Sequence, residues 1–383
     1  MENNHLSTKF RNFRSMVSVS SPGRINLIGE HTDYNEGFVM PTAIDQKIEF
    51  EFRKNDSDSD CHIFSETYDS YVEFDLDQIK PTEVSWANYL LGVINEIQLL
   101  GKRFTGFDCI IKSNLPIGAG ISSSAALECG FASGINELFD LGLSKMDIVK
   151  LSQAAENNFV GSNCGIMDQY ASVLSKKDHL ILLDCRSLEA TYIPADFKDC
   201  KVLLLNTRVE HNLAQGEYNN RRKECEDAVN HIQKKHHEVK ALRDVNEELL
   251  KEFKDELPSS TFARAAYVIE ENLRVQRAAE AIKQGRLKDF GSLMYQSHQG
   301  LQHQYEVSCP ELDFLVDYTR NKPFVYGARM MGGGFGGCTI NLIEASDAET
   351  FISEVLEAYE QQFGIRGEAI IVSPSQGTQI ERN

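Results

Sequence analysis

The alternation of hydrophobic and polar residues divides the first half of the chain into short strands followed by helices. Three β-rich runs, KIEFEFR, CHIFSETY and FDCIIKS, predict strands over residues 47–53, 61–68 and 107–113. Helices are expected after a serine-rich loop and around residues 146–160. The charged, turn-rich stretch KNDSDSD at 54–60 predicts a solvated hairpin connection.

The second half begins between two apolar runs, HLILLDCRS and KVLLLNTRV, which predict buried strands. A turn-rich stretch, ATYIPADFKDC at 190–200, separates them, and we place the boundary there, between domains 1–195 and 196–383. The later segments are a polar helix, a long helix with apolar positions at helical spacing, a strand–glycine loop–strand unit and a last helix, at 217–235, 265–285, 327–343 and 347–364. This irregular order of strands and helices favours the α+β class.

Composition and charge narrow the class of protein. A chain of 383 residues suggests about two or three domains. The formal net charge of -18 argues against nucleic acid or an anionic membrane as the main partner, although it allows a local phosphate site. The nine scattered cysteines lack CxxC or zinc spacing and suit a reducing cytosol. With no leader-like start and no long apolar run, we expect a cytoplasmic protein and, without a coiled coil, a monomer.

The stretch PIGAGISSSA at 116–125 combines glycines with hydroxyls just before an expected helix. Glycine allows close backbone approach, and the start of a helix presents unpaired N–H groups with partial positive charge. Together these features form a cradle for an anion, typically phosphate. A glycine-containing turn capped by serine explains the same pattern, so this stretch alone leaves both readings open.

The stretch SPGRINLIGEHTDYNEGFVMP at 21–41 gathers polar side chains after an apolar segment. Arg24 precedes that segment, and Glu30, His31 and Asp33 follow it at once. Carboxylates give sugar hydroxyls strong, charge-assisted acceptors, so the group suits a polyhydroxylated ligand. The alternative is a solvated turn capped by Asp33.

Two further carboxylates stand in segments with functional alternatives. Asp168 lies in the apolar segment SNCGIMDQYAS, where a partly buried carboxylate needs a partner, and Arg24 is a candidate. Asp168 could equally serve as a helix N-cap or in a structural salt bridge. Glu156, in QAAENNFVG, is either a solvated helix position or a metal ligand.

A second glycine loop, MGGGFGGC at 331–338, either turns sharply between strands or brings backbone against a ligand. Two glycine loops and several carboxylates in one chain favour a nucleotide enzyme. Neither loop has the spacing of a Walker A or Rossmann motif, and the chain lacks the HRD and DFG elements of protein kinases. The residues by themselves therefore indicate a two-domain phosphate-handling enzyme of another loop type.

Three segments, GRINLIGEHTDYNEG, LPIGAGISSSAALE and GARMMGGGFGGCT, resemble the ordered motifs of the GHMP small-molecule kinases. The EHTDY element, together with WANYLLGV, CGIMDQY, GEYNNRRKECE and YEVSCPELD, is similar to the galactokinase group of that family. The resemblance implies an N-terminal domain like ribosomal protein S5, a ferredoxin-like C-terminal domain and an active site between them. It also implies ATP-dependent phosphorylation of α-D-galactose at its anomeric hydroxyl, which yields galactose 1-phosphate and ADP.

The resemblance assigns a role to individual residues. It implies Asp168 as proton acceptor and Arg24 as the group that stabilises the transition state. It implies substrate contacts from Glu30, His31, Thr32, Asp33, Gly165 and Tyr218. It implies ATP contacts from Ser65, Trp86, Gly118, Ala119, Gly120, Ile121, Ser122, Ser123 and Ser124, and Mg²⁺ ligands at Ser124 and Glu156.

Two residues depart from the family pattern. Met331 stands where many relatives carry a small or hydroxylated residue, and it could crowd the sugar-side pocket or alter the closure of its loop. Ala119 stands where glycine is frequent. Two other functions stay open: a kinase for a related sugar such as N-acetylgalactosamine, galacturonate or arabinose, and a regulator that binds galactose and ATP without turnover. Because the SSSAA run is complete and both Arg24 and Asp168 are present, we favour the kinase.

Overall fold

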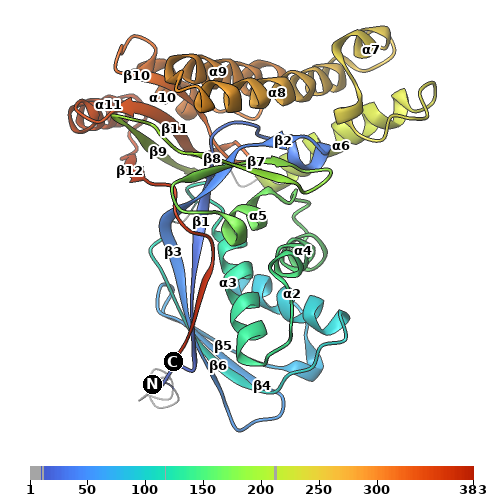
Figure 1. Cartoon of the computed structure of the whole chain (residues 1–383), viewed down its shortest axis with the longest axis vertical. Coiled ribbons are helices and arrows are strands. Elements are labelled where there is room, and N and C mark those ends of the chain that lie inside the picture. Colours follow the sequence, from blue (N-terminus) through green and yellow to red (C-terminus); the bar gives the residue numbers. More distant parts are fainter. Residues whose placement is uncertain (1–9, 11–12, 117, 211–213) are drawn as a thin grey trace.

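The computed structural model describes Phe10 and residues 13–116, 118–210 and 214–383 (Figure 1). Residues 1–9, which we considered above as a possible leader, lie outside the described residues. So does Ile117 of the glycine- and serine-rich stretch at 116–125, which we call the serine loop. The first half is built on a six-stranded sheet with the order β13-β1-β3-β6-β4-β5. Its strands are β1 (Val17–Asn26), β3 (Pro41–Lys54), β4 (Asp60–Ser65), β5 (Ser70–Asp75), β6 (Phe107–Ser113) and β13 (Gln379–Arg382).

The prediction of a hairpin at residues 54–60 is wrong. β3 and β4 are not neighbours, because β6 lies between them, antiparallel to β3 and parallel to β4. The apolar side chains of Phe107, Cys109 and Ile111 on β6 are buried, which the inner position of the strand allows. The charged loop therefore crosses from one strand to the second strand along the sheet.

Helices cover one face of this sheet (Figure 1). They are α2 (Ser85–Leu99), α3 (Ser123–Leu138), α4 (Lys145–Ala155) and α5 (Met167–Leu174), with a π-helical turn, η3 (Glu156–Val160), after α4 and a 3₁₀ turn, η2 (Leu76–Gln78), before α2. Glycines let α3 lie close to the sheet: a Cβ atom at Gly134 would come within 2.0 Å of the Phe52 ring. The later turns of α3 are thereby held against β1 and β3, where Gly130 likewise meets Phe50 and Ser21.

The second half has a four-stranded sheet of order β10-β11-β9-β12 with helices around it. The strands are β9 (Cys200–Glu210), β10 (Val325–Met330), β11 (Gly336–Glu344) and β12 (Glu368–Val372). The helices are α6 (Ala214–Ile232), η4 (Leu242–Asp244), α7 (Glu247–Glu252), α8 (Ser259–Lys283), α9 (Leu287–Gly300), η5 (Leu301–Tyr305), α10 (Pro310–Thr319) and α11 (Ala348–Phe363).

Two features connect the halves. A three-stranded sheet of β2 (Phe38–Val39), β7 (His179–Asp184) and β8 (Ala190–Pro194) lies between the larger sheets in Figure 1. The stretch predicted to be turn-rich thus contains a strand, because residues 190–194 pair with β7. The last strand, β13, returns to pair with β1, which the division at residue 195 did not anticipate.

The main hydrophobic core runs from one half into the other and includes Leu27, Val275 and Met331. The loops that carry the sequence motifs meet above this shared core. Among the described helices, none has the length and apolar character needed to cross a lipid bilayer.

Candidate active site

The residues after β1 turn sharply and direct several polar side chains to one side. Gly29 has φ of +103°, and a Cβ atom there would lie 2.8 Å from the Phe38 carbonyl oxygen. His31 also adopts a left-handed conformation, with φ of 61°. A short 3₁₀ turn, η1 (Asp33–Asn35), follows. The tight backbone places consecutive polar residues around a common space.

That space is a cavity of about 350 Å³. Its walls come from the β1 turn, α2, the segment from η3 to α5, α6, and the glycine loop between β10 and β11. It is lined by Arg24, Glu30, His31, Asp33, Tyr89, Glu156, Ser162, Cys164, Gly165, Met167, Asp168, Tyr218, Gly332, Gly333, Gly334 and Phe335. Most of the predicted substrate-contacting and catalytic residues therefore lie together, although they are far apart in the sequence.

Arg24 and Asp168 form a two-point ion pair at the cavity wall, which confirms the predicted pairing. Arg24 Nε lies 2.6 Å from Asp168 Oδ1, and Nη2 lies 2.7 Å from Oδ2. The Ser122 hydroxyl donates to the same Oδ2 atom. Burial lowers the pKa of Arg24, but the charges of Asp168 and Glu30 outweigh it and raise the pKa, so the guanidinium stays charged. The ion pair therefore connects the polar stretch at 21–41, which we call the sugar motif, to Ser122 of the serine loop.

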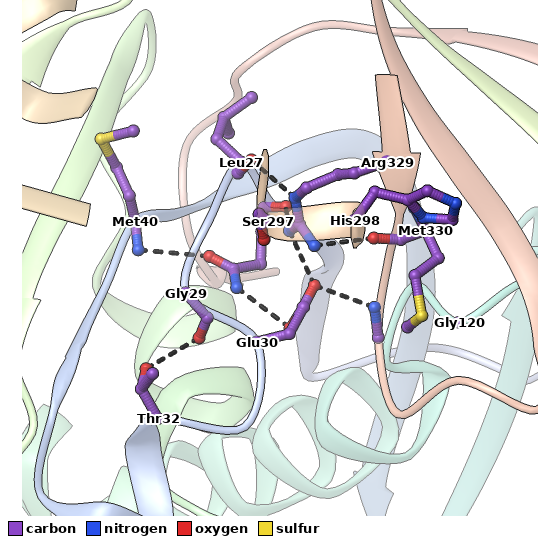
Figure 2. Close-up of polar contacts among 12 residues, drawn as sticks. Leu27, Gly29, Glu30, Thr32, Met40, Gly120, Ser297, His298, Arg329 and Met330 are labelled. Atoms are coloured by element: carbon purple, nitrogen blue, oxygen red, sulfur yellow. Dashed lines mark hydrogen bonds and ion pairs between the residues drawn. The ribbon is translucent and has the colours of Figure 1, made fainter. Parts of the chain in front are cut away.

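Glu30 belongs to a buried network with Arg329 of β10 (Figure 2). Glu30 Oε1 accepts hydrogen bonds from Arg329 Nη2 and the Gly332 backbone N–H, both at 2.9 Å. Its Oε2 accepts from Asn26 Nδ2 at 3.0 Å. Burial alone would raise the pKa of Glu30, but Arg329 and then Arg24 outweigh it, so the pKa is lowered. Glu30 is thus a permanent carboxylate that fixes the glycine loop as well as lining the cavity.

Arg329 is fully buried, and its role was not predicted from the sequence. Its guanidinium also donates to the carbonyl oxygens of Leu27, Met330 and Asn26, at 2.9, 2.7 and 2.5 Å. The available signal was an arginine between apolar residues in the strand pattern of GARMM. A charge in a buried strand requires a buried partner. Nothing in the local sequence identifies that partner as Glu30.

His31 and Thr32 follow Glu30 in the sequence, but only His31 lines the cavity. His31 lines the cavity, and its Nδ1 atom lies 2.7 Å from the Tyr34 hydroxyl. Burial lowers the pKa of His31 to about 4, so the ring is neutral near pH 7. Thr32, predicted to bind the substrate, does not line the cavity. Its hydroxyl lies 2.8 Å from the Gly29 and 2.6 Å from the Phe38 carbonyl oxygens and stabilises the turn instead.

Asp33 faces the cavity next to the segment that carries Asp168. A Cβ atom at Gly165 would lie 2.0 Å from Asp33 Oδ2, so glycine is required for this close approach. Burial, followed by the charge of Asp168, raises the pKa of Asp33 to about 6. Across the cavity, the Tyr218 ring lies 5.4 Å from the His31 ring between centroids. Asp33, His31 and Tyr218 therefore enclose a space that has hydrogen-bond acceptors as well as an aromatic wall.

The serine loop has the backbone geometry of an anion cradle. Gly118, Gly120 and Ser122 have φ of 70°, 69° and 55°, and α3 begins directly afterwards at Ser123. The Ser122 side chain does not cap the helix, because its hydroxyl is bonded to Asp168. The serine-cap alternative is therefore wrong for Ser122, and the first N–H groups of α3 are left for another acceptor.

The glycine loop at 331–338 packs against the serine loop at 116–125. A Cβ atom at Gly332 would lie 3.2 Å from the Gly120 carbonyl oxygen. The two residues that depart from the family pattern, Met331 and Ala119, are each 1% exposed and belong to the core. Met331 does not line the cavity, so it does not crowd it. Both departures are accommodated by packing.

A second cavity of about 110 Å³ lies beside the first, and Tyr89 lines both. It contains Ser65, Trp86, Ser123 and Ser124, which the family resemblance assigned to the nucleotide. The rings of Trp86 and Tyr68 are stacked, with centroids 6.3 Å apart and planes at 12°. An aromatic slot next to an anion cradle suits a base attached to phosphates.

Glu156, in the wall of the first cavity, lies next to a second buried carboxyl group, Glu128. Glu156 Oε2 accepts a hydrogen bond from Gln169 Nε2 at 2.8 Å, and the buried Glu128 lies beside it, with an Oε1 atom that has no partner. Burial, followed by the charge of Asp168, raises the pKa of Glu156 to about 7. Burial and Glu156 also raise the pKa of Glu128. Carboxyl groups this close favour a cation, and the sequence analysis missed Glu128.

The donor set fits Mg²⁺ as the family would bind it. Within the described residues, no group of three or more His, Cys, Asp or Glu side chains forms a complete metal site. Mg²⁺ does not require one, because it retains waters and takes oxygens from substrate phosphates. One carboxylate at Glu156 and one hydroxyl at Ser124, which lies close enough to lower the pKa of Glu156, supply oxygen ligands of the right kind.

Comparisons with known proteins assign the chain to a family. Family descriptions match at three places: the galactokinase galactose-binding signature at residues 7–54, the GHMP kinases N terminal domain at 88–176 and the GHMP kinases C terminal domain at 278–361. The galactokinase of Thermosipho africanus is 44% identical over 91% of this chain and 96% of its own length. That of Thermotoga maritima is 41% identical over 91% and 95%.

Solved structures agree with these sequence matches. Lactococcus lactis galactokinase, determined in complex with galactose, superimposes with a TM-score of 0.93 at 32% identity, covering 99% of this chain and 100% of that one. The mevalonate kinase of Methanococcus jannaschii has a TM-score of 0.66 at 21% identity and shares the fold.

Proposed function

Because this chain belongs to the galactokinase family of the GHMP kinases, we propose that it transfers the γ-phosphoryl group of ATP to α-D-galactose. The acceptor is the anomeric hydroxyl, and the products are galactose 1-phosphate and ADP. This reaction is the first committed step of galactose catabolism by the Leloir pathway. The larger cavity takes the sugar, and the serine loop with the adjoining aromatic slot takes the nucleotide.

One observation carries this proposal. Asp168 lines the sugar cavity while its Oδ2 atom accepts a hydrogen bond from Ser122 of the anion cradle. An aspartate in that position stands between an acceptor hydroxyl and a phosphate. Phosphoryl transfer needs such positioning and charge stabilisation more than it needs covalent chemistry.

The residues of the chain then take the following roles. Asp33 and Glu30 accept hydrogen bonds from sugar hydroxyls, and Gly165, His31 and Tyr218 complete the walls. Asp168 orients the anomeric hydroxyl and accepts its proton as the oxygen attacks phosphorus. Arg24 holds Asp168 through its two-point ion pair and stabilises negative charge in the transition state.

The nucleotide end holds ATP and its metal ion. The backbone from Gly118 to Ser124 binds the phosphates at the start of α3, and Trp86 and Ser65 contact the base and sugar of the nucleotide. Ser124 and Glu156 would hold Mg²⁺, which, when bound, neutralises phosphate charge.

We also propose that the protein acts as a cytoplasmic monomer. Its net charge of -18 opposes self-association, and the exposed large hydrophobic residues are few, among them Leu99, Leu100 and Leu273. Light scattering at increasing protein concentration tests this proposal, and a constant mass equal to that of two chains would contradict it.

The test of function is ADP release measured with ATP and Mg²⁺ on a panel of acceptors: galactose, N-acetylgalactosamine, glucose, arabinose, galacturonate and mevalonate. We expect turnover that is selective for galactose and lost when Mg²⁺ is chelated. Turnover on another sugar instead would contradict the substrate, and galactose binding without any ADP release would identify a sensor.

A further inference from the structure

A chain of hydrogen bonds leads from the cavity wall at His31 into the core of the second half. His31 Nδ1 lies 2.7 Å from the Tyr34 hydroxyl, which lies 2.8 Å from the Tyr305 hydroxyl. The Tyr305 hydroxyl in turn lies 3.2 Å from Cys225 Sγ. Tyr305 and Cys225 are 0% and 1% exposed. The chain therefore joins the sugar motif, η5 and α6 away from bulk water.

The protons in this chain have two possible directions. In the first, Cys225 donates to Tyr305, Tyr305 donates to Tyr34, and Tyr34 donates to His31 Nδ1. In the second, every bond is reversed, so that a phenol donates to sulfur while the other imidazole nitrogen keeps an unused lone pair.

The chemistry of the groups favours the first direction. A neutral imidazole nitrogen is a good acceptor, whereas a thiol sulfur is a weak one. Burial raises the pKa of Cys225 to about 12, so the thiol keeps its proton and has it to donate. The first direction pairs the imidazole lone pair with a phenol and places the N–H on Nε2, where the Gly333 backbone can accept it, whereas the second leaves a buried lone pair at Nε2, at a free-energy penalty.

The other end of the imidazole supports the same direction. His31 Nε2 is buried, and no side chain among the described residues bonds it. Burial lowers the pKa of His31, whereas the charge of Glu30 and the backbone of Gly333 in the glycine loop raise it. The Gly333 backbone therefore acts on the ring as a hydrogen-bond acceptor. Since Nδ1 is bonded to Tyr34, this carbonyl favours an N–H, rather than a lone pair, on Nε2.

We propose that Tyr34, Tyr305 and Cys225 are positioning residues that hold His31 in the tautomer protonated at Nε2. The ring then presents its N–H to the backbone of Gly333, in the glycine loop that lines the sugar cavity. The tautomer therefore fixes the glycine loop against the sugar motif, and its loss should loosen the wall that the sugar contacts. The identity of the ligand as galactose rests on the proposed function, but the tautomer does not.

The direct test is a long-range ¹H–¹⁵N correlation spectrum of histidine-labelled protein without sugar or nucleotide, with His31 assigned by its loss in His31→Gln. We expect the proton on Nε2 in the wild type and a mixture of tautomers in Tyr34→Phe. Tyr305→Phe should act in the same direction and replaces Tyr34→Phe if that variant does not fold. A wild-type proton on Nδ1, or an unchanged tautomer in both variants, would overturn the proposal.

Tyr267→Phe is the matched control. Tyr267 packs against Tyr305, with ring centroids 4.8 Å apart, but its hydroxyl donates to the Glu30 carbonyl oxygen and lies outside the chain of hydrogen bonds. Its loss should leave the His31 tautomer unchanged. A tautomer shift of the same size in Tyr267→Phe would attribute the effect to packing and overturn the proposal.

Kinetics separates positioning from a general structural role. Tyr34→Phe should raise the galactose KM about three- to tenfold, the loss expected for one neutral hydrogen bond, with a smaller change in kcat. His31→Gln keeps an N–H₂ donor near Nε2, whereas His31→Asn places its amide near Nδ1. We expect the lower KM for His31→Gln, and equal values would overturn the proposal. Should another sugar be the substrate, the spectra still decide the tautomer, and KM is measured with that sugar.

Discussion

The two ends of the active site are built by different means. At the sugar end, side chains carry the chemistry, and the protein already pairs two of the carboxylates, Glu30 with Arg329 and Asp168 with Arg24, while burial raises the pKa of Asp33. At the nucleotide end, a glycine-containing backbone and an aromatic slot form the walls. In the wall of the sugar cavity, Glu156 lies close to the buried Glu128, and both have raised pKa values.

The sugar end is therefore organised before its ligand binds, whereas the nucleotide end is completed by its ligand. The charged groups of the sugar end are held before the sugar arrives, which lowers the entropy lost on binding. The raised pKa values of Glu156 and Glu128 would be lowered by a bound cation, as in the proposed Mg²⁺ site. Substitutions at the first end should alter geometry and stability, and substitutions at the second should alter nucleotide and metal binding.

The largest effect is expected where the two ends meet. Asp168→Asn removes the proposed proton acceptor and should lower kcat by a factor of about 10² to 10⁴. ATP affinity should change little, because the anion cradle remains. ADP release and a nucleotide-binding titration measure the two quantities. Near-normal turnover would show that Asp168 is not the proton acceptor.

At the sugar end, the buried ion pair between Glu30 and Arg329 should stabilise the fold. Arg329→Met leaves Glu30 as a buried carboxylate without its cation, which should reduce the free energy of unfolding by about 3–5 kcal/mol. Urea denaturation measures this change. The double variant with Glu30→Gln removes both charges and should recover much of the loss. An equally unstable double variant would mean that packing, rather than charge pairing, is responsible.

Substitution of Asp33 should weaken the binding of the sugar and leave the binding of the nucleotide unchanged. Loss of a charge-assisted hydrogen bond in Asp33→Asn is worth about 1.5–3 kcal/mol, so the galactose KM should rise roughly ten- to hundredfold. Gly165→Ala is the companion variant, because its Cβ would displace the same carboxylate. Steady-state kinetics with each substrate varied tests both. A change in the ATP KM of similar size would contradict the separation of the two ends.

Part of the pH dependence of activity, the part near pH 6, should originate at Asp33 of the sugar end. With a pKa of about 6, Asp33 is neutral below that pH, so kcat/KM for galactose should fall as the pH drops through 6. Stability moves in the opposite direction. The folded-state pKa lies above the ordinary value of 3.8, so ionised Asp33 disfavours folding above pH 6, and this penalty is relieved on acidification towards pH 4. A profile near pH 6 that is identical in Asp33→Asn would reject the assignment.

The smallest effect is expected in the aromatic slot. Trp86→Ala removes the partner of Tyr68 and should raise the ATP KM about three- to tenfold, with the galactose KM unchanged. Leu99→Ala, at an exposed position on the same helix, serves as the control. Equal ATP kinetics in the two variants would move the base-binding site elsewhere.

The sequence could predict those parts of the site whose residues are contiguous. Glu30, His31 and Asp33 occupy one short turn, and the serine loop contains its own glycines and helix start, so local rules describe them. The ion pair of Arg24 with Asp168 was predictable because each was a charge in an apolar segment that needed a partner.

The parts that depended on contacts across the fold could not be predicted. Glu30 and Arg329 are separated by 299 positions in the chain. Tyr305 and Cys225 lie in two segments that resemble the family, YEVSCPELD and GEYNNRRKECE, but neither segment shows that the two side chains meet. The position of β6 between β3 and β4 depends on which strand is most deeply buried, which alternation alone does not reveal. Thr32 was assigned to the substrate by its place in the motif, whereas its hydroxyl is used within the turn.

Calorimetric titration of galactose into the protein without nucleotide or metal tests the central difference between the two ends. We predict that one galactose binds to the wild type under these conditions, and that Asp33→Asn binds it roughly ten- to hundredfold more weakly. If galactose gave no heat until ATP and Mg²⁺ were added, the sugar end would not be preorganised, and the account would be wrong.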